Sequence, residues 1–254
     1  MKDEVKGKVF LVTGSGRGLG AALATAAARA GGRVVINCRR DEKRAEALAA
    51  ELRKTCPEVR AVKADVTEAE GARRLVEEAH KAFGRVDVLV NTVGAFEWKT
   101  VADMDPAEWR LVLGSNLDSV YNVSRLVLPG MRAHRFGRIV NFAEVGAERT
   151  AAHARVAAWA AAKAGVVAFS KALALEEARF GITVNVVCPG VIEEKTGARG
   201  RRAAQAGNGT QGDRVPVGRA AHCDDVARAV LFFASPAADF LTGQVLAVAG
   251  GAFL

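Results

Sequence analysis

Residues Val9–Gly20 read VFLVTGSGRGLG, and this stretch decides the fold. Its first four residues are apolar and predict a buried strand, and the alanine-rich stretch Ala21–Ala30 that follows predicts a helix. The glycines between them predict a tight turn at the start of that helix. Because the first turn of a helix offers free N–H groups and the positive end of its dipole, this arrangement is typical of a nucleotide phosphate site.

Short apolar runs and helical stretches alternate along the whole chain. This alternation indicates a parallel sheet covered by helices on both faces. We find neither a repeat nor a linker, so we expect residues 1–254 to form one domain. The predicted strands are Val9–Val12, Arg33–Asn37, Val59–Lys63, Val86–Val90, Arg138–Phe142, Ile182–Val187 and Val245–Val248. The further predicted helices are Asp41–Leu52, Thr67–Phe83 with a capping box at Thr67–Glu70, Pro106–His134 with a break near Gly114, Ala157–Phe180 and Asp224–Ala234.

Composition and charge restrict the possible functions. Half of the 254 residues are apolar and a quarter are charged, which is ordinary for a globular protein. The net charge of +8 comes from arginines spread along the chain, so we expect no nucleic-acid partner. No apolar run approaches the roughly 20 residues of a membrane span, and the charged N-terminus lacks a signal peptide, so we expect a cytoplasmic protein without a membrane partner. The four cysteines lack metal-ligand spacing, so we expect reduced thiols and no metal site.

The stretch 193–219 is rich in Gly, Arg, Ala and Gln and has no clear periodicity. It follows the carboxyl end of a predicted strand, where ligands bind in such sheets, so we interpret it as a mobile lid. Arg199, Arg201 and Arg202 lie in this stretch, and Arg149 and Arg155 lie in the loop that we expect to face it. These arginines suit an anionic or acyl-carrier-linked substrate, and the alternative is an ordinary solvated surface.

Several further motifs follow one another in a fixed order. Thr13–Gly20 matches the pattern TGxxxGxG, Asn91–Gly94 follows the fourth strand, and Asn116 follows in Ser115-Asn116-Leu117. With these motifs the chain resembles the classical short-chain dehydrogenase/reductase family from end to end. The resemblance implies a single-domain, doubly wound Rossmann fold with a seven-stranded parallel sheet, and a homodimer or homotetramer formed through residues 106–134 and 157–180. The other matching motifs are Asp65-Val66, Gly137–Asn141, Pro189-Gly190, Leu241–Val245 and Gly250-Gly251.

The resemblance also implies a nicotinamide dinucleotide at the glycine-rich turn. NAD-selective members usually carry an acidic residue after the second strand, where this chain has Asn37-Cys38-Arg39-Arg40. Guanidinium groups suit a 2′-phosphate, so Arg17 and Arg39 favour NADP(H) over NAD(H), unless Arg39 and Arg40 are only solvated surface charges. Asp65 resembles the residue that binds the adenine amine, with a helix cap as the alternative. The implied cofactor-binding residues are Gly14, Ser15, Arg17, Gly18, Leu19, Arg39, Asp65, Val66, Asn91, Gly94, Lys163, Pro189, Gly190 and Ile192.

The positions that carry catalysis in the family are altered. Its members use a Ser, a Tyr and a Lys together with an Asn, and Asn116 and Lys163 match the last two. Trp159 replaces the tyrosine one helical turn before Lys163, and its indole N–H does not titrate, so it cannot supply a proton. Glu144 stands at the serine position, and Glu194 stands where a threonine contacts the carboxamide. We therefore predict that Asn116, Glu144, Trp159 and Lys163 are the catalytic residues of an atypical member.

Three hypotheses about the function of this altered site remain open. The first is an NADP(H)-dependent reductase of a small carbonyl-type substrate, aromatic or polycyclic and stacked on Trp159. Its proton would come from Glu144, from water relayed through Asn116 and Lys163, from His153 or from a phenol of the substrate. The second is a non-redox enzyme with Glu144 as its acid or base, and the third is a catalytically silent NADP(H)-binding subunit. Glu144 could also serve only as an ion-pair partner of Lys163.

Overall fold

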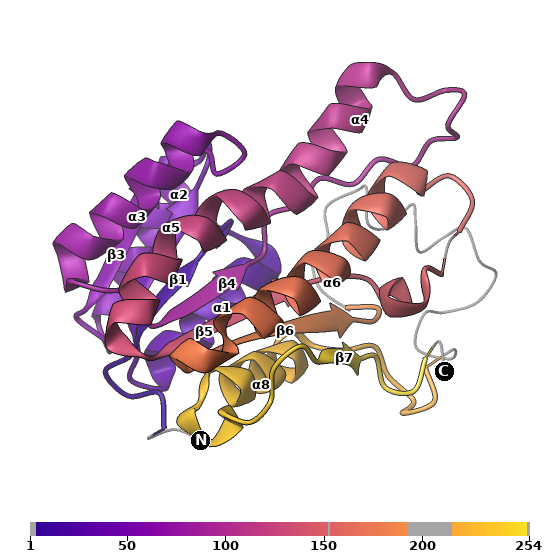
Figure 1. Ribbon diagram of the computed structural model, residues 1–254. Coiled ribbons are helices and arrows are strands. Elements are labelled where there is room, and N and C mark those ends of the chain that lie inside the picture. The colour runs from indigo at the N-terminus through magenta and orange to yellow at the C-terminus, as the bar shows by residue number, and fades with distance from the viewer. Residues whose placement is uncertain (1–3, 152, 193–214, 253–254) are drawn as a thin grey trace.

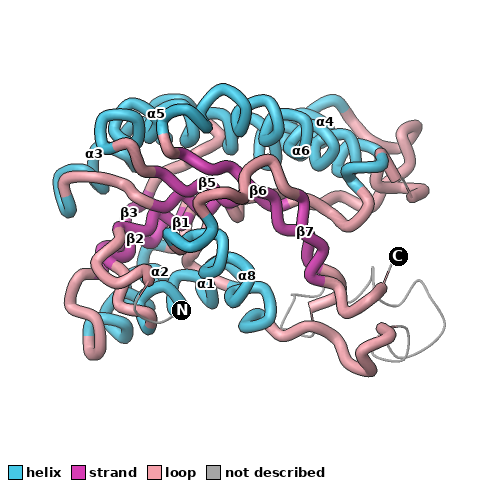
Figure 2. The backbone as a smooth tube through the Cα atoms, turned by 60° about the horizontal axis from the view of Figure 1, so that its bottom comes forward, coloured by secondary structure: helices cyan, strands magenta, loops and turns pink. Residues whose placement is uncertain are grey.

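One sheet of seven parallel strands runs through the protein, in the spatial order β3 (Val59–Lys63), β2 (Arg33–Cys38), β1 (Val9–Val12), β4 (Val88–Asn91), β5 (Gly137–Phe142), β6 (Ile182–Pro189) and β7 (Val245–Val248). The computed structural model describes residues 4–151, 153–192 and 215–252 (Figure 1). Figure 2 shows one face of the sheet covered by α1 (Gly18–Arg29), α2 (Glu42–Arg53) and α8 (Cys223–Ala234). The other face is covered by α3 (Ala69–Phe83), α4 (Pro106–Leu113), α5 (Ser119–His134) and α6 (Ala157–Glu177). The predicted doubly wound Rossmann fold is therefore confirmed.

The central strands are buried on both faces, as their unbroken apolar runs predict. All four residues of β1 and of β4 are buried. Leu23, Ala45 and Val226 belong to the apolar cluster that fills the layer beside α1, α2 and α8. Leu75 and Val127 belong to the cluster beside α3, α5 and α6. The strand order reverses between β1 and β4, so the carboxyl ends of these two strands border the crevice where ligands bind in such sheets.

Three elements begin two or more residues away from their predicted first residues. Helix α1 begins at Gly18 instead of Ala21, and β4 begins at Val88 instead of Val86. Helix α3 begins at Ala69, and the predicted capping box at Thr67 is absent because Glu68 is the N-cap residue and makes no side-chain cap. The Thr67 hydroxyl donates instead to Oδ1 of Asp65 at 2.7 Å. A turn closed by this side-chain bond competes with helical geometry and delays the start of α3.

The predicted break near Gly114 is a single π-helical turn, Gly114–Asp118, between α4 and α5. Helix α4 has a complete capping box, in which Asp105 accepts from the backbone of Glu108 and Glu108 accepts from the backbone of Asp105. A π-turn inserted between helices occurs frequently at functional sites, and this one contains Asn116.

Helix α6 and the 3₁₀ turn Ala178–Phe180 after it form the only described helix long and apolar enough, by length and composition, to cross a membrane. This helix nevertheless carries Lys163, Ser170 and Glu177 on its buried face. It packs against β6 (Figure 2), so its apolar residues contribute to the core of the domain. Most of the predicted lid, residues 193–214, lies outside the described residues, as do Arg199, Arg201 and Arg202.

Candidate active site

The glycine-rich turn lies between β1 and α1 at the carboxyl edge of the sheet. Ser15 is buried, and its hydroxyl donates to the carbonyl of Val12 at 2.6 Å and accepts the N–H of Asn37 at 3.0 Å. Oδ1 of Asn37 accepts the N–H of Gly14 at 3.0 Å. Gly14 has a φ of +62°, which glycine adopts without strain. Asn37 at the end of β2 therefore positions the turn, a role that the sequence did not reveal.

Helix α1 is open at its N-terminus. Its N-cap residue, Arg17, is extended and exposed and makes no side-chain cap, so the first N–H groups of the helix are available to an anion. Gly20 brings α1 against the turn, because an added Cβ would lie 2.7 Å from the carbonyl oxygen of Gly14 and 2.7 Å from Oγ1 of Thr92. Gly18 has a φ of +55°. These residues fit a dinucleotide phosphate at this end of the helix.

The structure brings together two of the residues predicted to bind the adenosine half of a cofactor. Nη1 of Arg39 lies 3.8 Å from Oδ2 of Asp65, and both side chains are partly exposed. Oδ1 of Asp65 closes the turn with Thr67, so Asp65 is not the N-cap of α3. Val66 is buried, and Leu19 packs against the core. The exposed guanidinium of Arg39 is thus held at the edge of the site by a carboxylate.

A chain of buried amides links the middle strands to α6. Nδ2 of Asn91 donates to Oδ1 of Asn141 at 2.9 Å, and Nδ2 of Asn141 donates to Oγ of Ser170 at 2.9 Å. The network fixes the register between β4, β5 and α6. Since the side chain of Asn91 belongs to this network, a cofactor beside Asn91 would meet its backbone.

Asn116 holds the π-turn against the loop after β4. Its Nδ2 donates to the carbonyl of Ala95 at 2.7 Å and to the carbonyl of Val112 at 2.9 Å. A Cβ on Gly94 would lie 2.4 Å from Oδ1 of Asn116, so only glycine fits there. Oδ1 itself is buried and has no hydrogen-bond partner among the described residues. It is therefore an unused acceptor beside the predicted cofactor segment.

Lys163 is buried on α6 and points to the end of β5. Its Nζ donates to the carbonyl of Phe142 at 2.8 Å. Burial lowers the pKa of Lys163 to about 8, and the negative charges that Cys188 and Glu144 can carry oppose this shift. An ammonium group in this position is fixed in direction and partly deprotonated near neutral pH.

Glu144 lies two residues beyond the end of β5 and is 8% exposed. Burial raises the pKa of its carboxyl group, and the positive charges of His153 and Lys163 act against this rise. Its Oε1 is buried and has no hydrogen-bond partner among the described residues. The charges of Glu144 and Lys163 act on one another, but the described part of the chain shows no ion pair between the two side chains.

Trp159 is half-buried and belongs to an aromatic cluster that the sequence did not reveal. The ring of Phe96 meets Trp159 edge to face, with centroids 5.2 Å apart, and lies 6.1 Å from the ring of Trp98. The backbone N–H of Lys99 donates to the carbonyl of Arg155 at 2.9 Å and ties this loop to the segment before α6. The signal was available, because Phe96 and Trp98 follow Gly94 closely in the same loop.

The predicted cofactor residues after β6 lie beside β7. The N–H of Gly190 donates to the carbonyl of Val248 at 3.0 Å, and a Cβ on Gly190 would lie 2.9 Å from Ala249. Pro189 ends β6, and Ile192 forms an isolated parallel bridge with Ala221. Glu194 lies outside the described residues.

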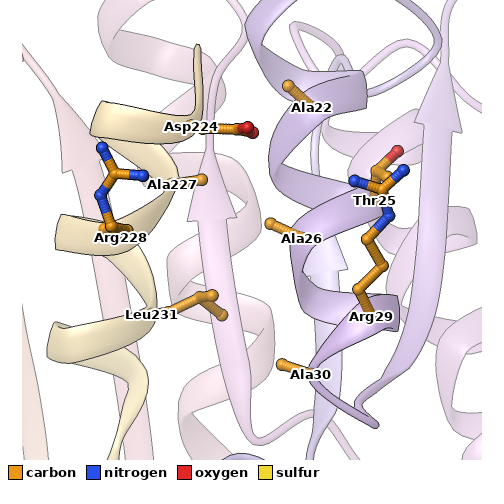
Figure 3. A pocket seen from close by; sticks show the side chains of 9 residues that line it. All are labelled: Ala22, Thr25, Ala26, Arg29, Ala30, Asp224, Ala227, Arg228 and Leu231. Carbon is orange, nitrogen blue, oxygen red and sulfur yellow. The ribbon is translucent and has the colours of Figure 1, made fainter. Parts of the chain in front are cut away.

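A separate surface pocket of about 320 Å³ lies between α1 and α8. Figure 3 shows the two helices facing each other across it, with Ala22, Ala26 and Ala30 on α1 opposite Asp224, Ala227 and Leu231 on α8. None of the residues predicted for cofactor binding or catalysis lines it. The described residues hold no cluster of three or more metal-ligating side chains, and all four cysteines are buried.

Comparison with known proteins agrees with this architecture. Residues 14–252 match the family described as enoyl-(acyl carrier protein) reductase. The 3-oxoacyl-acyl-carrier-protein reductase FabG of Haemophilus influenzae is 39% identical over 261 residues, which cover 98% of this chain and 100% of that protein. The acetoacetyl-CoA reductase of Shinella zoogloeoides is 36% identical over 97% of this chain and 98% of its own.

A solved structure shows the same likeness. An actinorhodin polyketide ketoreductase variant, crystallised with NADPH, superposes with a TM-score of 0.89 at 35% identity and covers 96% of this chain and 97% of its own. The matches extend over nearly the whole of each protein, so they include the glycine-rich turn, the π-turn and α6. The chain therefore belongs to the classical short-chain dehydrogenase/reductase family of oxidoreductases, which bind nicotinamide dinucleotides.

Proposed function

We propose that the protein is an atypical NADP(H)-dependent reductase of a small carbonyl-type substrate, aromatic or polycyclic and of biosynthetic origin. The observation that carries this proposal is the placement of Lys163. Its ammonium group is buried and fixed on the carbonyl of Phe142, one turn from Trp159 on the same helix. The proposal is also supported by the glycine-rich turn, which Asn37 holds, and by the π-turn, which Asn116 holds against the loop after β4. The solved ketoreductase with NADPH supports the same class of reaction.

The cofactor supplies the hydride when it is bound, and the chain supplies its binding site. We assign the phosphates to Gly14, Ser15, Arg17, Gly18 and Leu19 at the start of α1. Arg39 suits a 2′-phosphate, with Asp65 and Val66 beside the adenine. The remaining contacts are assigned to Asn91, Gly94, Lys163, Pro189, Gly190 and Ile192.

The proton that completes carbonyl reduction must come from a group other than Trp159. Glu144 is one candidate, because burial raises its pKa and favours the protonated form. Water relayed through Asn116 and Lys163, His153 and a phenol of the substrate are the others. We propose that Asn116, Glu144, Trp159 and Lys163 together contact the substrate or the cofactor.

The competing readings are a non-redox enzyme with Glu144 as acid or base and a catalytically silent NADP(H)-binding subunit. An assay of NADPH oxidation with carbonyl compounds distinguishes them. A reductase lowers the NADPH absorbance in step with product formation. A non-redox enzyme converts substrate at constant absorbance, and a silent subunit does neither. Substrate conversion without NADPH oxidation would therefore contradict the proposal.

We expect Arg39→Ala to weaken NADPH binding about tenfold or more and to leave NADH binding unchanged, because a guanidinium–phosphate contact is charge-assisted. Calorimetry of the unaltered protein and the variant with each cofactor measures this difference. Arg29→Ala is the matched control, since it removes the same charge at the C-terminal end of α1, which is the end away from the glycine-rich turn. Equal affinity of the unaltered protein for NADPH and NADH would contradict NADP(H) selectivity.

The outward surface of α5 and α6 suits self-association. Tyr121 is 51% exposed and Leu175 is 83% exposed, and Trp109 and Leu111 of α4 are also exposed. We propose that these helices form a homodimer or homotetramer in the cytoplasm, with no nucleic-acid or membrane partner. Sedimentation velocity of the protein would detect such an assembly.

A further inference from the structure

Glu144 presents a buried carboxylate oxygen that nothing in the described part of the protein binds. The residue is 8% exposed, and Oε1 has no hydrogen-bond donor. Buried charges are normally paired or coordinate an ion, because an unpaired carboxylate in a low-dielectric site is unfavourable. The free oxygen therefore indicates that a ligand completes the site, either as a hydrogen-bond donor or as a cation.

The charged groups that face this carboxylate do not neutralise it by direct contact. Lys163 faces it from α6, but its Nζ is engaged with the carbonyl of Phe142. His153 faces it from the loop before α6 and is exposed to solvent. Arg149 and Arg155 of the same loops are exposed to solvent, and Nε of Arg149 lies 3.6 Å from Oε1 of Glu148.

The aromatic side chains on and beside the next turn of α6 favour a cation over a neutral donor, since Lys163 acts electrostatically on Glu144 and Trp159 lies one helical turn before Lys163. Trp159 stands one turn before Lys163 on α6, and Phe96 packs edge to face against it at 5.2 Å. Trp98 lies next to Phe96 and is 41% exposed. Indole rings attract cations more strongly than other aromatic side chains do, and cages of aromatic side chains bind quaternary ammonium ligands.

The lack of a titratable side chain at Trp159 also favours a cationic substrate. Reduction of a ketone adds a hydride to carbon and a proton to oxygen, and Trp159 cannot provide that proton. An iminium ion, a C=N bond with positive charge on nitrogen, needs no proton. The hydride of the reduced nicotinamide cofactor forms the new C–H bond, and the C=N π pair becomes the nitrogen lone pair. The iminium is reduced to a neutral amine, and the cofactor is oxidised to its cationic form.

We propose that the substrate of this protein carries an iminium group, which Glu144 pairs with and which Phe96, Trp98 and Trp159 surround. The inference rests on the proposed reductase function and narrows its substrate class from carbonyl-type compounds to C=N cations. Glu144 then acts as a substrate-binding carboxylate that stabilises the cation before hydride transfer. A flat, cyclic iminium fits the aromatic cluster best, because its ring can stack on an indole.

Two probes of the same shape test the charge. One is the 2-methyl-3,4-dihydroisoquinolinium ion, which is a permanent cation, and the other is neutral 1-tetralone. Binding of each is measured by calorimetry in the presence of 1,4,5,6-tetrahydro-NADP, a cofactor analogue that cannot donate hydride. Turnover of each is measured with NADPH. We expect the cation to bind tightly, and Glu144→Gln to weaken its binding and its kcat/KM about 100-fold, the effect of removing one partner of a buried ion pair.

Three further variants make the test specific. Glu148→Gln removes an exposed carboxylate four residues along the chain and should leave both probes unaffected. Trp159→Phe should retain most of the affinity for the cation, whereas Trp159→Leu should lose about tenfold through loss of the aromatic face. Binding of 1-tetralone should change by less than about tenfold in Glu144→Gln, the scale of one neutral hydrogen bond. Thermal melting checks the fold, and Glu144→Gln should melt no lower than the unaltered protein at pH 7, since it removes a buried charge.

The outcomes separate the two proposals. Equal binding and reduction of the cation by Glu144→Gln and the unaltered protein would overturn the iminium assignment, and so would binding of 1-tetralone but not of the cation. Either result would leave the reductase proposal in place if 1-tetralone is reduced. Binding of the cation through Glu144 without oxidation of NADPH would support the cation site and contradict the reductase proposal.

Discussion

Gly20→Ala is expected to abolish cofactor binding and to destabilise the protein. Its new Cβ would lie 2.7 Å from the carbonyl oxygen of Gly14 and 2.9 Å from Cα of Ser15. Both atoms belong to the backbone, so α1 or the turn must move to relieve the clash. Overpacking of this kind costs about 1–3 kcal/mol of unfolding free energy. Displacing the turn from the phosphates should weaken NADPH binding about 100-fold or more, because each lost hydrogen bond to a charged phosphate costs about 1.5–3 kcal/mol.

Chemical denaturation and calorimetry with NADPH measure the two effects. Gly16→Ala is the control for stability, because its Cβ would lie 3.4 Å from Cβ of Cys38, an ordinary contact. We expect its unfolding free energy to stay within about 0.5 kcal/mol of that of the unaltered protein. Undiminished NADPH binding by a folded Gly20→Ala protein would show that the cofactor does not approach this turn.

Lys163→Met is expected to separate activity from stability. Turnover of NADPH should fall at least about 100-fold, because no other described ammonium group occupies this buried position. The same substitution should also change how the free energy of unfolding depends on pH. Burial lowers the pKa of Lys163 from 10.5 to about 8, so above pH 8 the unfolded chain binds more protons at this residue than the folded protein does. The contribution of Lys163 to stability therefore improves as the pH rises.

Urea denaturation of the cofactor-free protein between pH 7 and pH 9 tests this sign. The unaltered protein should gain stability relative to Lys163→Met across this window. Taking the difference between the two proteins removes the contribution of groups that titrate equally in both. The thiol of Cys188 does not titrate between pH 7 and pH 9 in the folded protein, because burial raises its pKa to about 12. Lys171→Met, at an exposed position on the same helix, should retain turnover and show no such change. A pH-independent stability difference would mean that Lys163 is not desolvated as described.

Local signals were sufficient for most of the secondary structure. The apolar runs of β1 and β4 predict strands buried on both faces, and helices between successive strands require parallel pairing. The start of α3 was mispredicted because two local signals competed at Thr67. Its sequence fits a capping box, yet its hydroxyl bonds to Asp65 two residues earlier. Only the folded geometry shows which of these partners a short polar side chain takes.

The glycine-rich turn was predicted from its spacing, whereas the catalytic positions were predicted from the resemblance to the family and stay predictions. Glycines between a strand and a helix leave few alternatives, and Trp159 and Lys163 share a helix face because they are one turn apart. Asn37, Asn141 and Phe96 could not be assigned in this way. Each acts through a partner on a distant segment, and such contacts depend on strand register and loop path.

The order of apolar runs, helices and glycines thus suffices for the fold and for the place of the glycine-rich turn, because periodicity and positive φ are properties of the local chain. The electrostatic character of Glu144 and Lys163 is decided by tertiary packing. Both residues carry ordinary charged side chains in the sequence, and both are buried when β5 and α6 pack together. Burial shifts their pKa values toward each other and leaves one carboxylate oxygen of Glu144 without a donor among the residues that the structure describes. The free energy of a charge depends on the solvent that surrounding segments exclude, which no local pattern of residues encodes.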